Sequence, residues 1–243
     1  MKFGIFGDVH ANLAAFQAVL GALRNAGCDQ LLCTGDIVGY GPSPVECLHL
    51  IREQNIPCVF GNHDEYVTAL FGPGLEKLGS DVKASIQWSQ NQLAMDDLKW
   101  LAQLPRHLEY DTFSVIHGAL GPNPWMYIVN RDNLQDHFTH QKKPLTFNGH
   151  THLPLLGFQR EGMPAEMDFL RTTTLPAANR ILINSGSVGQ PRDRDPRAAC
   201  CIYDTDKNSV HPLRVPYDIA ATQALIRAAN LPERYALRLA EGK

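Results

Sequence analysis

Three short apolar segments near the start of the chain are each followed at once by a glycine and by polar side chains of the kind that bind metals. The segments are residues 2–6, 30–34 and 56–60, and the turns after them are Gly7-Asp8-Val9-His10, Gly35-Asp36 and Gly61-Asn62-His63-Asp64. Helical patterns at 12–26 and 43–54 separate the segments, which predicts successive strand and helix units with a parallel sheet. The carboxyl ends of parallel strands meet at one edge of a sheet, where open α/β sheets bind their ligands. The three turns are therefore expected to converge.

The side chains in these turns suit a divalent metal ion. In an extended segment, residues two apart project to the same side, so Asp8 and His10 are expected to bind one ion together. The Asp36 carboxylate is able to bridge two cations, and the Asn62 amide oxygen is a ligand for a hard cation beside the titratable ring of His63. For each turn alone, a turn or helix cap or a buried histidine is an equally good interpretation. Capping by chance explains three convergent turns poorly.

Two further strand ends carry histidine next to glycine. Residues 65–104 are expected to be mostly helical core with a break at 72–74, after which a hairpin over 108–116 ends in His117-Gly118. The strand at 145–147 opens into Asn148-Gly149-His150-Thr151-His152. If this segment is extended, His150 and His152 face one cleft, and imidazole is the commonest neutral metal ligand. The loop at 119–127 is either part of a substrate rim or the surroundings of a buried Trp125.

The composition favours one globular protein in a reducing compartment. With 243 residues, 44% of them hydrophobic, we expect a single domain over residues 1–243. The net charge of -3 gives no general basic field for nucleic acid or an anionic membrane. The six cysteines form no CxxC pair and lie mostly in apolar runs, which is typical of reduced thiols. With no signal-peptide pattern and no run of eighteen apolar residues, we expect a cytoplasmic protein without a membrane anchor.

In their order, these motifs resemble those of the calcineurin-like metallophosphoesterases. That family has Asp-x-His, Gly-Asp, Gly-Asn-His-Asp or Gly-Asn-His-Glu, a strand-end His, and Gly-His-x-His, and this chain has all five in the same order over about residues 1–205. The resemblance implies an α/β fold, a four-layer α-β-β-α sandwich of two mixed sheets face to face with helices outside. It also implies a dinuclear metal site at the carboxyl edge of the strands. C-terminal helices at about 217–240 are expected to follow this core.

The resemblance implies a role for each motif residue. One divalent ion is expected to be held by Asp8, His10, Asp36 and His152, and the other by Asp36, Asn62, His117 and His150. With oxygen and nitrogen ligands and no thiolate, the ions are expected to be manganese, iron, zinc, cobalt or nickel. Two such ions generate hydroxide from bridging water and clamp the oxygens of a phosphate ester. His63 is left to donate a proton to the leaving alkoxide, and Asp64 to orient His63 or a neighbouring ligand.

Two stretches bear on the branch of the family. The protein serine/threonine phosphatases have Asp and Arg where this chain has Gly39 and Tyr40, which argues against that branch. A flexible loop at 184–190 leads into residues 191–197, and within this stretch residues 186–192 resemble the Gly-Ser-x-Gly-x-Pro-Arg loop of small bacterial-type phosphoesterases. Arg192 and Arg194 would then neutralise a second phosphate of a nucleotide, and Tyr40 is a third candidate for substrate binding. Local Arg-Asp pairing that stiffens an exposed turn is the alternative.

The expected function is hydrolysis of a small phosphorylated substrate: a phosphomonoester, a phosphodiester or an anhydride of nucleotide type. The alternatives are a protein phosphatase and a non-catalytic scaffold that keeps the fold and binds a partner protein. The loop at 157–174 is left between a cover for the site, a strand pair and a contact with a second copy in a homo-oligomer. Residues 198–203 and 209–215 are expected to form a hairpin on the second sheet, and the helices after them to carry no chemistry.

Overall fold

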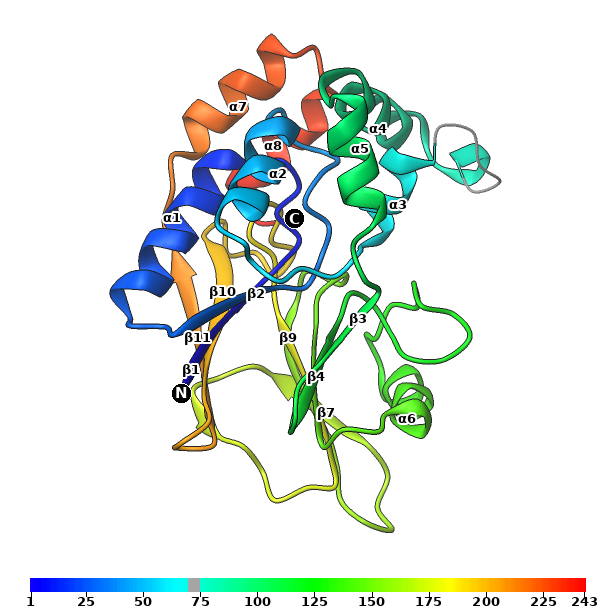
Figure 1. Ribbon diagram of the computed structural model, residues 1–243, viewed down its shortest axis with the longest axis vertical. Coiled ribbons are helices and arrows are strands. Elements are labelled where there is room, and N and C mark those ends of the chain that lie inside the picture. The colour runs from blue at the N-terminus through cyan, green and yellow to red at the C-terminus, as the bar shows by residue number, and fades with distance from the viewer. Residues whose placement is uncertain (70–74) are drawn as a thin grey trace.

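Two mixed β-sheets form the middle of the molecule. The computed structural model describes residues 1–69 and 75–243 (Figure 1), so the break expected at 72–74 lies outside the described residues. The first sheet has the order β2-β1-β10-β11-β8 and the second the order β3-β4-β5-β9-β6-β7. The strands of the first sheet are β1 (Lys2–Phe6), β2 (Gln30–Cys33), β8 (Thr173–Thr174), β10 (Ala198–Asp204) and β11 (Ser209–Val215). Those of the second are β3 (His107–Glu109), β4 (Phe113–Ile116), β5 (Leu145–Asn148), β6 (Pro154–Gln159), β7 (Glu166–Phe169) and β9 (Arg180–Ser185).

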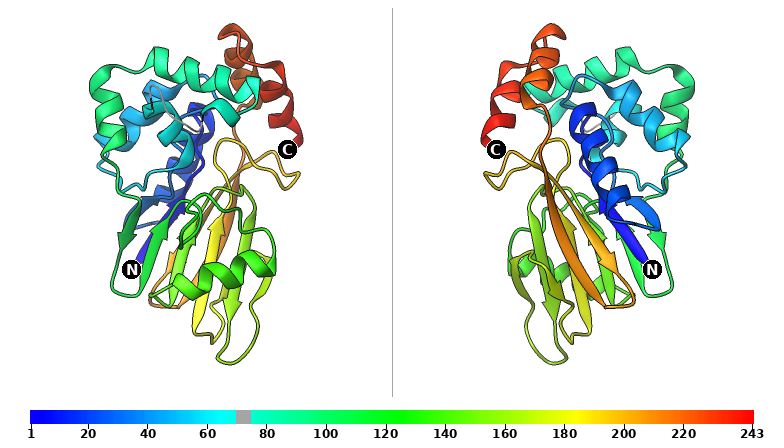
Figure 2. Two further views of the ribbon diagram at one scale, coloured as in Figure 1. Left: turned by 90° about the vertical axis from the view of Figure 1, so that its right-hand side faces the viewer. Right: turned by 90° about the vertical axis from the view of Figure 1, so that its left-hand side faces the viewer.

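Helices lie outside both sheets, which confirms the expected α-β-β-α arrangement. Figure 2 shows α6 (Arg131–His140) on the outer side of the second sheet, where Phe138 packs with Leu182 of β9. The described helices on the side of the first sheet are α1 (Leu13–Asn25), α2 (Pro44–Glu53), α3 (Asn62–Thr68), the 3-10 helix η1 (Leu75–Lys77), α4 (Ser80–Gln92), α5 (Met95–Ala102), α7 (Ile219–Ala228) and α8 (Glu233–Glu241).

Alternation along β1 explains how the first sheet joins two cores. Phe3 and Ile5 point between the sheets, where the ring centroid of Phe3 lies 5.0 Å from that of Phe113 in β4. Phe6 points the other way and packs against Phe16 of α1, with ring centroids 5.3 Å apart. Successive side chains of a strand face opposite sides of the sheet, so an apolar strand of this kind is buried on both faces.

The helix after β1 begins and ends where its sequence predicts. The Asn12 side chain accepts a hydrogen bond from the Ala15 amide at 3.3 Å, which satisfies one of the free donors of the first turn. Gly27, with φ of +71°, follows the helix end in the left-handed conformation that glycine adopts without strain. The helix α1 brings the chain back to the other end of the sheet, so that β2 pairs in parallel with β1. Both strands then end at the same edge.

The third segment, residues 56–60, does not form the expected strand. It makes a single bridge to β2, between Cys33 and Cys58. Pro57 has no amide hydrogen to donate to a ladder, and the Phe60 amide bonds to the carbonyl of Pro105 at 2.8 Å instead of to the sheet. The chain therefore leaves the sheet early, and Asn62 and His63 lie in the first turn of α3 instead of in a turn after a strand.

Three expectations for the second half of the chain have a clear outcome. The hairpin of β10 and β11 pairs with β1, so it belongs to the first sheet and the expectation of the second sheet was wrong. The stretch at 157–174 contains the strand pair of β6 and β7, one of the three alternatives. The two terminal helices form as expected, but they pack against Tyr40 near the strand ends. No helix in the described part of the chain has both the length and the apolar character needed to cross a membrane.

Candidate metal centre

The predicted ligands converge in one buried cluster at the carboxyl ends of the strands. β1 and β2 end just before Asp8 and Asp36, and β4 and β5 end just before His117 and Gly149. All seven predicted ligand side chains are buried, with at most 5% of any of them exposed. Three groups of potential ligand atoms within 4.8 Å of one another occur among the described residues: Asp8, His10 and His152; His10, Asp36 and His63; and Asp36, His117 and His150.

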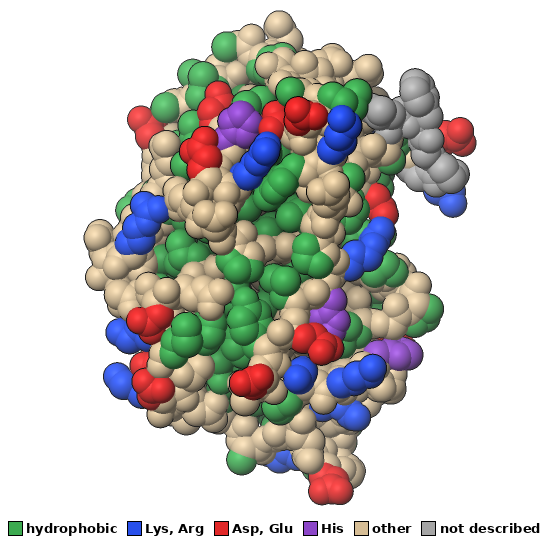
Figure 3. Space-filling view, in the orientation of Figure 1, with side chains coloured by type: hydrophobic (Ala, Val, Ile, Leu, Met, Phe, Trp, Pro, Cys, Tyr) green, Lys and Arg blue, Asp and Glu red, His purple; other side chains and the backbone are tan. Residues whose placement is uncertain are grey.

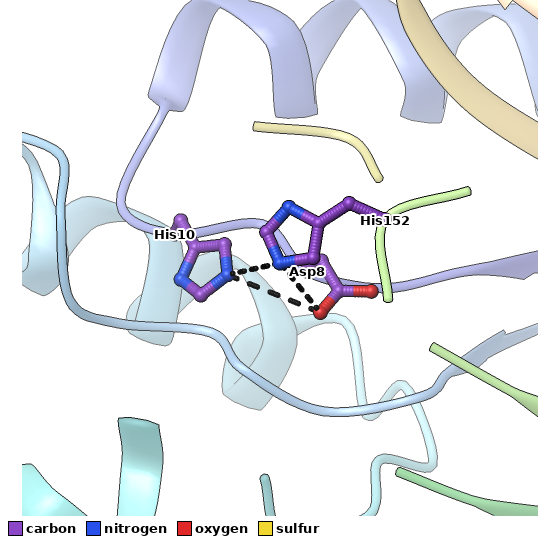
Figure 4. Close-up of side chains that lie close together, drawn as sticks. All are labelled: Asp8, His10 and His152. Carbon is purple, nitrogen blue, oxygen red and sulfur yellow. Dashed lines mark hydrogen bonds and ion pairs between the residues drawn. The ribbon is translucent and has the colours of Figure 1, made fainter. Parts of the chain in front are cut away.

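The first group combines two side chains from the turn after β1 with one from the turn after β5. Figure 4 shows the side chains of Asp8, His10 and His152 directed toward one another. The His152 Nε2 atom lies 3.3 Å from Asp8 Oδ1 and 3.1 Å from His10 Nε2, and His10 Nε2 lies 3.9 Å from Asp8 Oδ1. Two ring nitrogens and a carboxylate oxygen thus point at a common position.

Asp36 lies between this group and the other predicted ligands. Its Oδ2 atom is 3.6 Å from His10 Nε2 and 3.3 Å from His117 Nε2. On the far side, His117 Nε2 lies 3.0 Å from Asn62 Oδ1. One carboxylate therefore contacts a member of each predicted ligand set.

Backbone carbonyl groups fix the orientation of four of the histidine rings. His10, His117 and His152 donate from Nδ1 to the carbonyls of Val38, Thr34 and Gln190, at 3.2, 2.7 and 2.6 Å. His150 donates from Nε2 to the carbonyl of Trp125 at 3.0 Å. A carbonyl only accepts, so the bonded nitrogen carries the hydrogen and the other nitrogen of a neutral ring keeps a free lone pair. Metal-binding histidines usually donate the N–H of their other ring nitrogen in this way. Here Nε2 of three rings and Nδ1 of His150 are left to bind a cation.

Five of the seven predicted ligand residues have a left-handed backbone. The extended conformation expected for the segments that carry them is therefore wrong. Asp8, His10, Asp36, His150 and His152 have φ between +47° and +69°. Residues other than glycine adopt this region at a cost of order 1–3 kcal/mol each, and such residues cluster at functional sites. The side chains of Asp8 and His10 meet because the chain turns sharply after Phe6. Hydrogen bonds from the Asp8 and His10 amides to the carbonyls of Gly35 and Asp36, at 2.9 and 3.0 Å, hold this turn.

Asp64 organises the backbone around Asp36. Its two carboxylate oxygens accept hydrogen bonds from the amides of Asp36, Ile37, Val38 and Gly61, at 2.9 to 3.3 Å. The Gly61 bond also caps the start of α3. The side chain therefore ties the strained turn after β2 to the helix that carries Asn62 and His63.

His63 borders the cluster without belonging to either predicted ligand set. Its ring centroid lies 4.8 Å from that of His10 and 4.3 Å from that of Tyr40. Its backbone amide donates to Asp36 Oδ1 at 2.7 Å. The buried Nδ1 atom has no hydrogen-bond partner among the described residues, and a Cβ atom at Gly39 would lie 2.5 Å from it. Packing against Tyr40 and against the backbone of Gly39 therefore fixes the ring. Gly39 has no side chain and so offers His63 no carboxylate partner.

The charges of the site favour a bound cation. Burial raises the pKa of Asp8 to about 7 and lowers the pKa of His150 to about 3. Burial also opposes the charge of Asp36, but His117, His63 and His10 outweigh it and hold the Asp36 pKa well below its ordinary value. Burial lowers the pKa of His117, but the charge of Asp36 and the hydrogen bond to it raise the pKa by more. The pKa of His117 is therefore raised to about 10. A buried carboxylate that draws positive charge, with the His150 ring kept neutral nearby, is the electrostatic setting of a metal site.

The arginines at the loop before β10 do not all follow one of the two alternatives, which were phosphate binding and local Arg-Asp pairing. Arg197 pairs with Asp195 at 2.6 Å, and Asp193 pairs with Arg214, as local pairing requires. Arg192 bonds to Gln190 Oε1 at 3.0 Å, and its buried Nε atom has no partner among the described residues. The backbone amide of Arg192 donates to the carbonyl of His152 at 3.4 Å, so the residue lies next to the cluster. Burial is the main cause that lowers the pKa of His63 to about 4, and the charge of Arg192 also lowers it. The exposed Arg194 side chain makes no hydrogen bond or ion pair with the predicted ligands in residues 1–69 and 75–243.

The preceding loop at 184–190, expected to be flexible, is buried and tied by hydrogen bonds to the turn after β1. Ser187 donates from its hydroxyl to the Asp8 carbonyl at 2.9 Å, and the amides of Val188 and Gly189 bond to the carbonyls of Gly7 and Asp8 at 3.0 and 2.9 Å. These groups are buried because the loop lies against the turn after β1. The carbonyl of Gln190 then reaches His152, so this loop positions a predicted ligand.

The loop at 119–127 lies at the rim, and it contains a residue that sequence analysis did not single out. Tyr127 is 47% exposed and stacks on His150, with ring centroids 4.0 Å apart and ring planes at 26°. Trp125 is half-buried, accepts from His150 through its carbonyl and donates from Nε1 to Glu65 at 2.9 Å. An aromatic residue in a proline-rich loop after a ligand-bearing strand was the available signal, but it did not distinguish Tyr127 from a core aromatic.

The fold and this cluster define a class of protein: a two-sheet α/β protein with a buried cluster of histidine and carboxylate side chains suited to metal ions. The chain belongs to the calcineurin-like phosphoesterase superfamily, whose domain model it matches over residues 1–208. The protein is therefore a phosphoesterase of a metal-dependent family.

Three relatives illustrate the range of the similarity. An uncharacterized protein, MJ0912 of Methanocaldococcus jannaschii, is 34% identical over 98% of this chain and 97% of its own length. The crystal structure of a metallophosphoesterase from Sphaerobacter thermophilus is 38% identical and superposes with a TM-score of 0.85 over the full length of both chains. The symmetrical bis(5'-nucleosyl)-tetraphosphatase of Haemophilus ducreyi is 32% identical over 49% of this chain, and the match spans 45% of that enzyme.

Proposed function

We propose that this protein hydrolyses phosphate esters or anhydrides of small, nucleotide-type substrates with the help of two divalent cations. The observation that carries the proposal is the position of Asp36, whose carboxylate contacts His10 of one predicted ligand set and His117 of the other. A single carboxylate between two buried groups of ligands is what a dinuclear centre requires. The printed similarity to a tetraphosphatase supports a nucleotide substrate with an anhydride bond.

The residues fit the metals that the family implies. Asp8, His10 and His152 would hold one ion, Asn62, His117 and His150 the other, and Asp36 would contact both. The donor set of carboxylate, amide and imidazole atoms suits manganese, iron, zinc, cobalt or nickel. The free lone pairs of the four oriented rings support this fit, because each carbonyl bond turns the other nitrogen inward. Such ions, when bound, make water a stronger nucleophile and neutralise charge on the phosphate.

His63 is assigned to the leaving group. Its backbone bond to Asp36 and its packing against Tyr40 place the ring beside both groups of ligands. An anionic phosphate next to the imidazole favours its protonated form, from which the ring donates a proton to the departing oxygen. Asp64 acts as a positioning residue, since its carboxylate binds four backbone amides and holds the turn of Asp36.

Two features favour a small substrate over a macromolecule. Figure 3 shows basic and acidic side chains interspersed over the face it draws, so that face has no basic tract for a nucleic acid backbone. The Gly39 backbone lies against His63 where the protein serine/threonine phosphatases have a carboxylate, which argues against that alternative. We assign Arg192 to the substrate phosphate, because its backbone amide bonds to the carbonyl of His152 at 3.4 Å and its buried Nε atom has no partner among the described residues.

The test is turnover by the purified, manganese-loaded protein on a panel of substrates. The panel holds bis(4-nitrophenyl) phosphate, 4-nitrophenyl phosphate, diadenosine tetraphosphate and a cyclic nucleotide. Asp36→Asn removes the shared carboxylate, and Asp96→Asn, at an exposed position in α5, is the matched control. We expect metal-dependent turnover of one panel member that is retained in Asp96→Asn and lost in Asp36→Asn. No turnover by a protein that holds two ions would favour the scaffold alternative.

A further inference from the structure

Tyr127 differs from the other aromatic side chains that contact the histidines of the cluster. Tyr40, Tyr66 and Trp125 are partly buried, whereas Tyr127 is 47% exposed. Its ring lies nearly parallel to that of His150, with centroids 4.0 Å apart and planes at 26°. His150 is buried, so this contact covers one face of the tyrosine ring. The exposed surface of Tyr127 lies away from that covered face.

The residues on either side of Tyr127 hold it in place. Ile128 is buried and packs in the apolar cluster that includes residues of α6. Trp125 donates from Nε1 to Glu65 at 2.9 Å and accepts from His150 through its carbonyl at 3.0 Å. The Tyr127 ring is thus presented by a segment that is anchored on both sides. A rigid aromatic side chain loses little conformational entropy when a ligand binds to it.

The segment around Tyr127 carries no charged side chain. Residues 118–130 contain no Asp, Glu, Lys or Arg, and Val129, two residues after Tyr127, is exposed as well. A further phosphate group of a substrate would find no cation among these side chains. A neutral planar ring would find an aromatic face on which to stack. The chemistry of this part of the rim therefore fits an uncharged aromatic group.

We propose that the exposed face of Tyr127 stacks on the base of a nucleotide whose phosphate binds at the neighbouring metal centre. The contact between Tyr127 and His150, a predicted ligand, places this face next to the site where the phosphate binds. The inference rests on the proposed hydrolytic function of that site. It narrows the substrate class to phosphates that carry a nucleobase, and it makes Tyr127 a specificity-determining residue.

The experiment compares two ligands that differ by the base. They are the phosphonate analogues of adenosine monophosphate and of ribose 5-phosphate, in which a P–C bond replaces the ester P–O bond, so hydrolysis does not consume them. Binding of each analogue to the manganese-loaded protein is measured by calorimetry. We expect wild type to prefer the adenosine analogue and Tyr127→Ala to weaken its binding about 5- to 100-fold, the effect of one base stacked on an aromatic ring. Binding of the ribose analogue should change by less than about 3-fold on this argument.

Three further variants separate stacking on the base from support of His150. Tyr127→Phe keeps the ring without its hydroxyl group and should retain the preference. Tyr127→Leu keeps an apolar cover over His150 without an aromatic face and should lose most of the preference. Phe169→Ala removes an aromatic side chain that is exposed in β7 and should leave both affinities unchanged. Metal content and melting temperature are compared across the set.

The outcomes also separate this inference from the function beneath it. If wild type does not prefer the adenosine analogue, or if the preference survives in Tyr127→Ala, there is no base subsite at this ring. Loss of the preference in Tyr127→Phe would assign it to the hydroxyl group, and equal weakening of both ligands in Tyr127→Ala would mean that the ring merely supports His150; either result overturns the proposal. If the substrate panel is not hydrolysed while the preference is found and lost as expected, the base subsite stands and the hydrolytic function fails.

Discussion

His63 stands out among the buried residues because its Nδ1 atom has no hydrogen-bond partner in residues 1–69 and 75–243, while the neighbouring histidine rings are held by carbonyl groups. A ring that lies outside both predicted ligand sets and is fixed by packing is free to exchange a proton with a substrate. Its only polar link to the predicted ligands in the described residues is the backbone amide, which donates to Asp36. A change of the side chain therefore leaves that link in place.

We expect His63→Ala to retain both metal ions and to lower kcat about 10²- to 10⁴-fold, the usual contribution of a positioned acid or base. Metal content is measured by elemental analysis and kcat with the best substrate of the panel. His211→Ala, at an exposed position in β11, is the matched control and should keep its rate. Normal metal content together with an unchanged kcat would remove His63 from the reaction.

The sequence predicts which residues converge in the cluster, but it does not predict the backbone conformation that brings their side chains together. Asp8, His10, His150 and His152 could be found because their chemical types recur at the ends of apolar segments. Their left-handed backbone could not be found, since nothing in a local pattern indicates it and long-range bonds enforce it. For the same reason the role of Asp64 was left open: its four partners are fixed by the contact between α3 and the turn after β2.

At the scale of elements, α6 contains a buried ionisable group outside the site. His137 is fully buried; its Nδ1 accepts from the Leu120 amide at 3.1 Å, and its Nε2 donates to Gln141 Oε1 at 3.0 Å. The bond from the Leu120 amide needs the neutral ring, because a protonated Nδ1 is unable to accept. Burial lowers the pKa of His137 to about 4. The helix is thus linked to pH through one side chain.

We expect this histidine to contribute to acid unfolding. Its pKa is about 4 in the folded protein against 6.5 as the ordinary value, so the unfolded chain takes up the proton first. The stabilisation is complete above pH 6.5 and is lost as the pH falls toward 4, on the order of 2–3 kcal/mol of it by pH 4.5. His137→Gln should remove this part of the pH dependence. Urea unfolding of both proteins at pH 7 and pH 4.5 measures it, and parallel losses of stability in the two would contradict it.

The elements themselves show where local patterns fail. Helix α1 and strand β1 follow from apolar spacing, a capping asparagine and a terminal glycine. The segment at 56–60 has the same apolar character but no strand forms, because Pro57 interrupts the ladder and Pro105 offers Phe60 another partner. The place of β10 and β11 in the first sheet, and the contact of α8 with Tyr40, depend on contacts between residues far apart in sequence. A local pattern carries no information on such contacts.

At the scale of the whole molecule, the predicted ligands come from both sheets. Asp8 and Asp36 follow strands of the first sheet, and His117 and His150 follow strands of the second. Bound cations would therefore join the two layers at one edge, in addition to the apolar core between them. A ligand that binds only the folded state stabilises it by mass action. Metal occupancy and thermal stability are expected to be coupled.

Removal of metal should lower the melting temperature. At a free metal concentration of about 1,000 times the dissociation constant, binding contributes about 4 kcal/mol, which corresponds to roughly 8–16 °C for a chain of this size. Calorimetry with manganese and with excess chelator measures the difference in wild type and in Asp36→Asn. Because Asp36 contacts members of both ligand sets, the variant should lose most of the metal-dependent difference. An equal shift in both proteins would show that the stabilising ion binds elsewhere, and Asp36 would then have no bridging role.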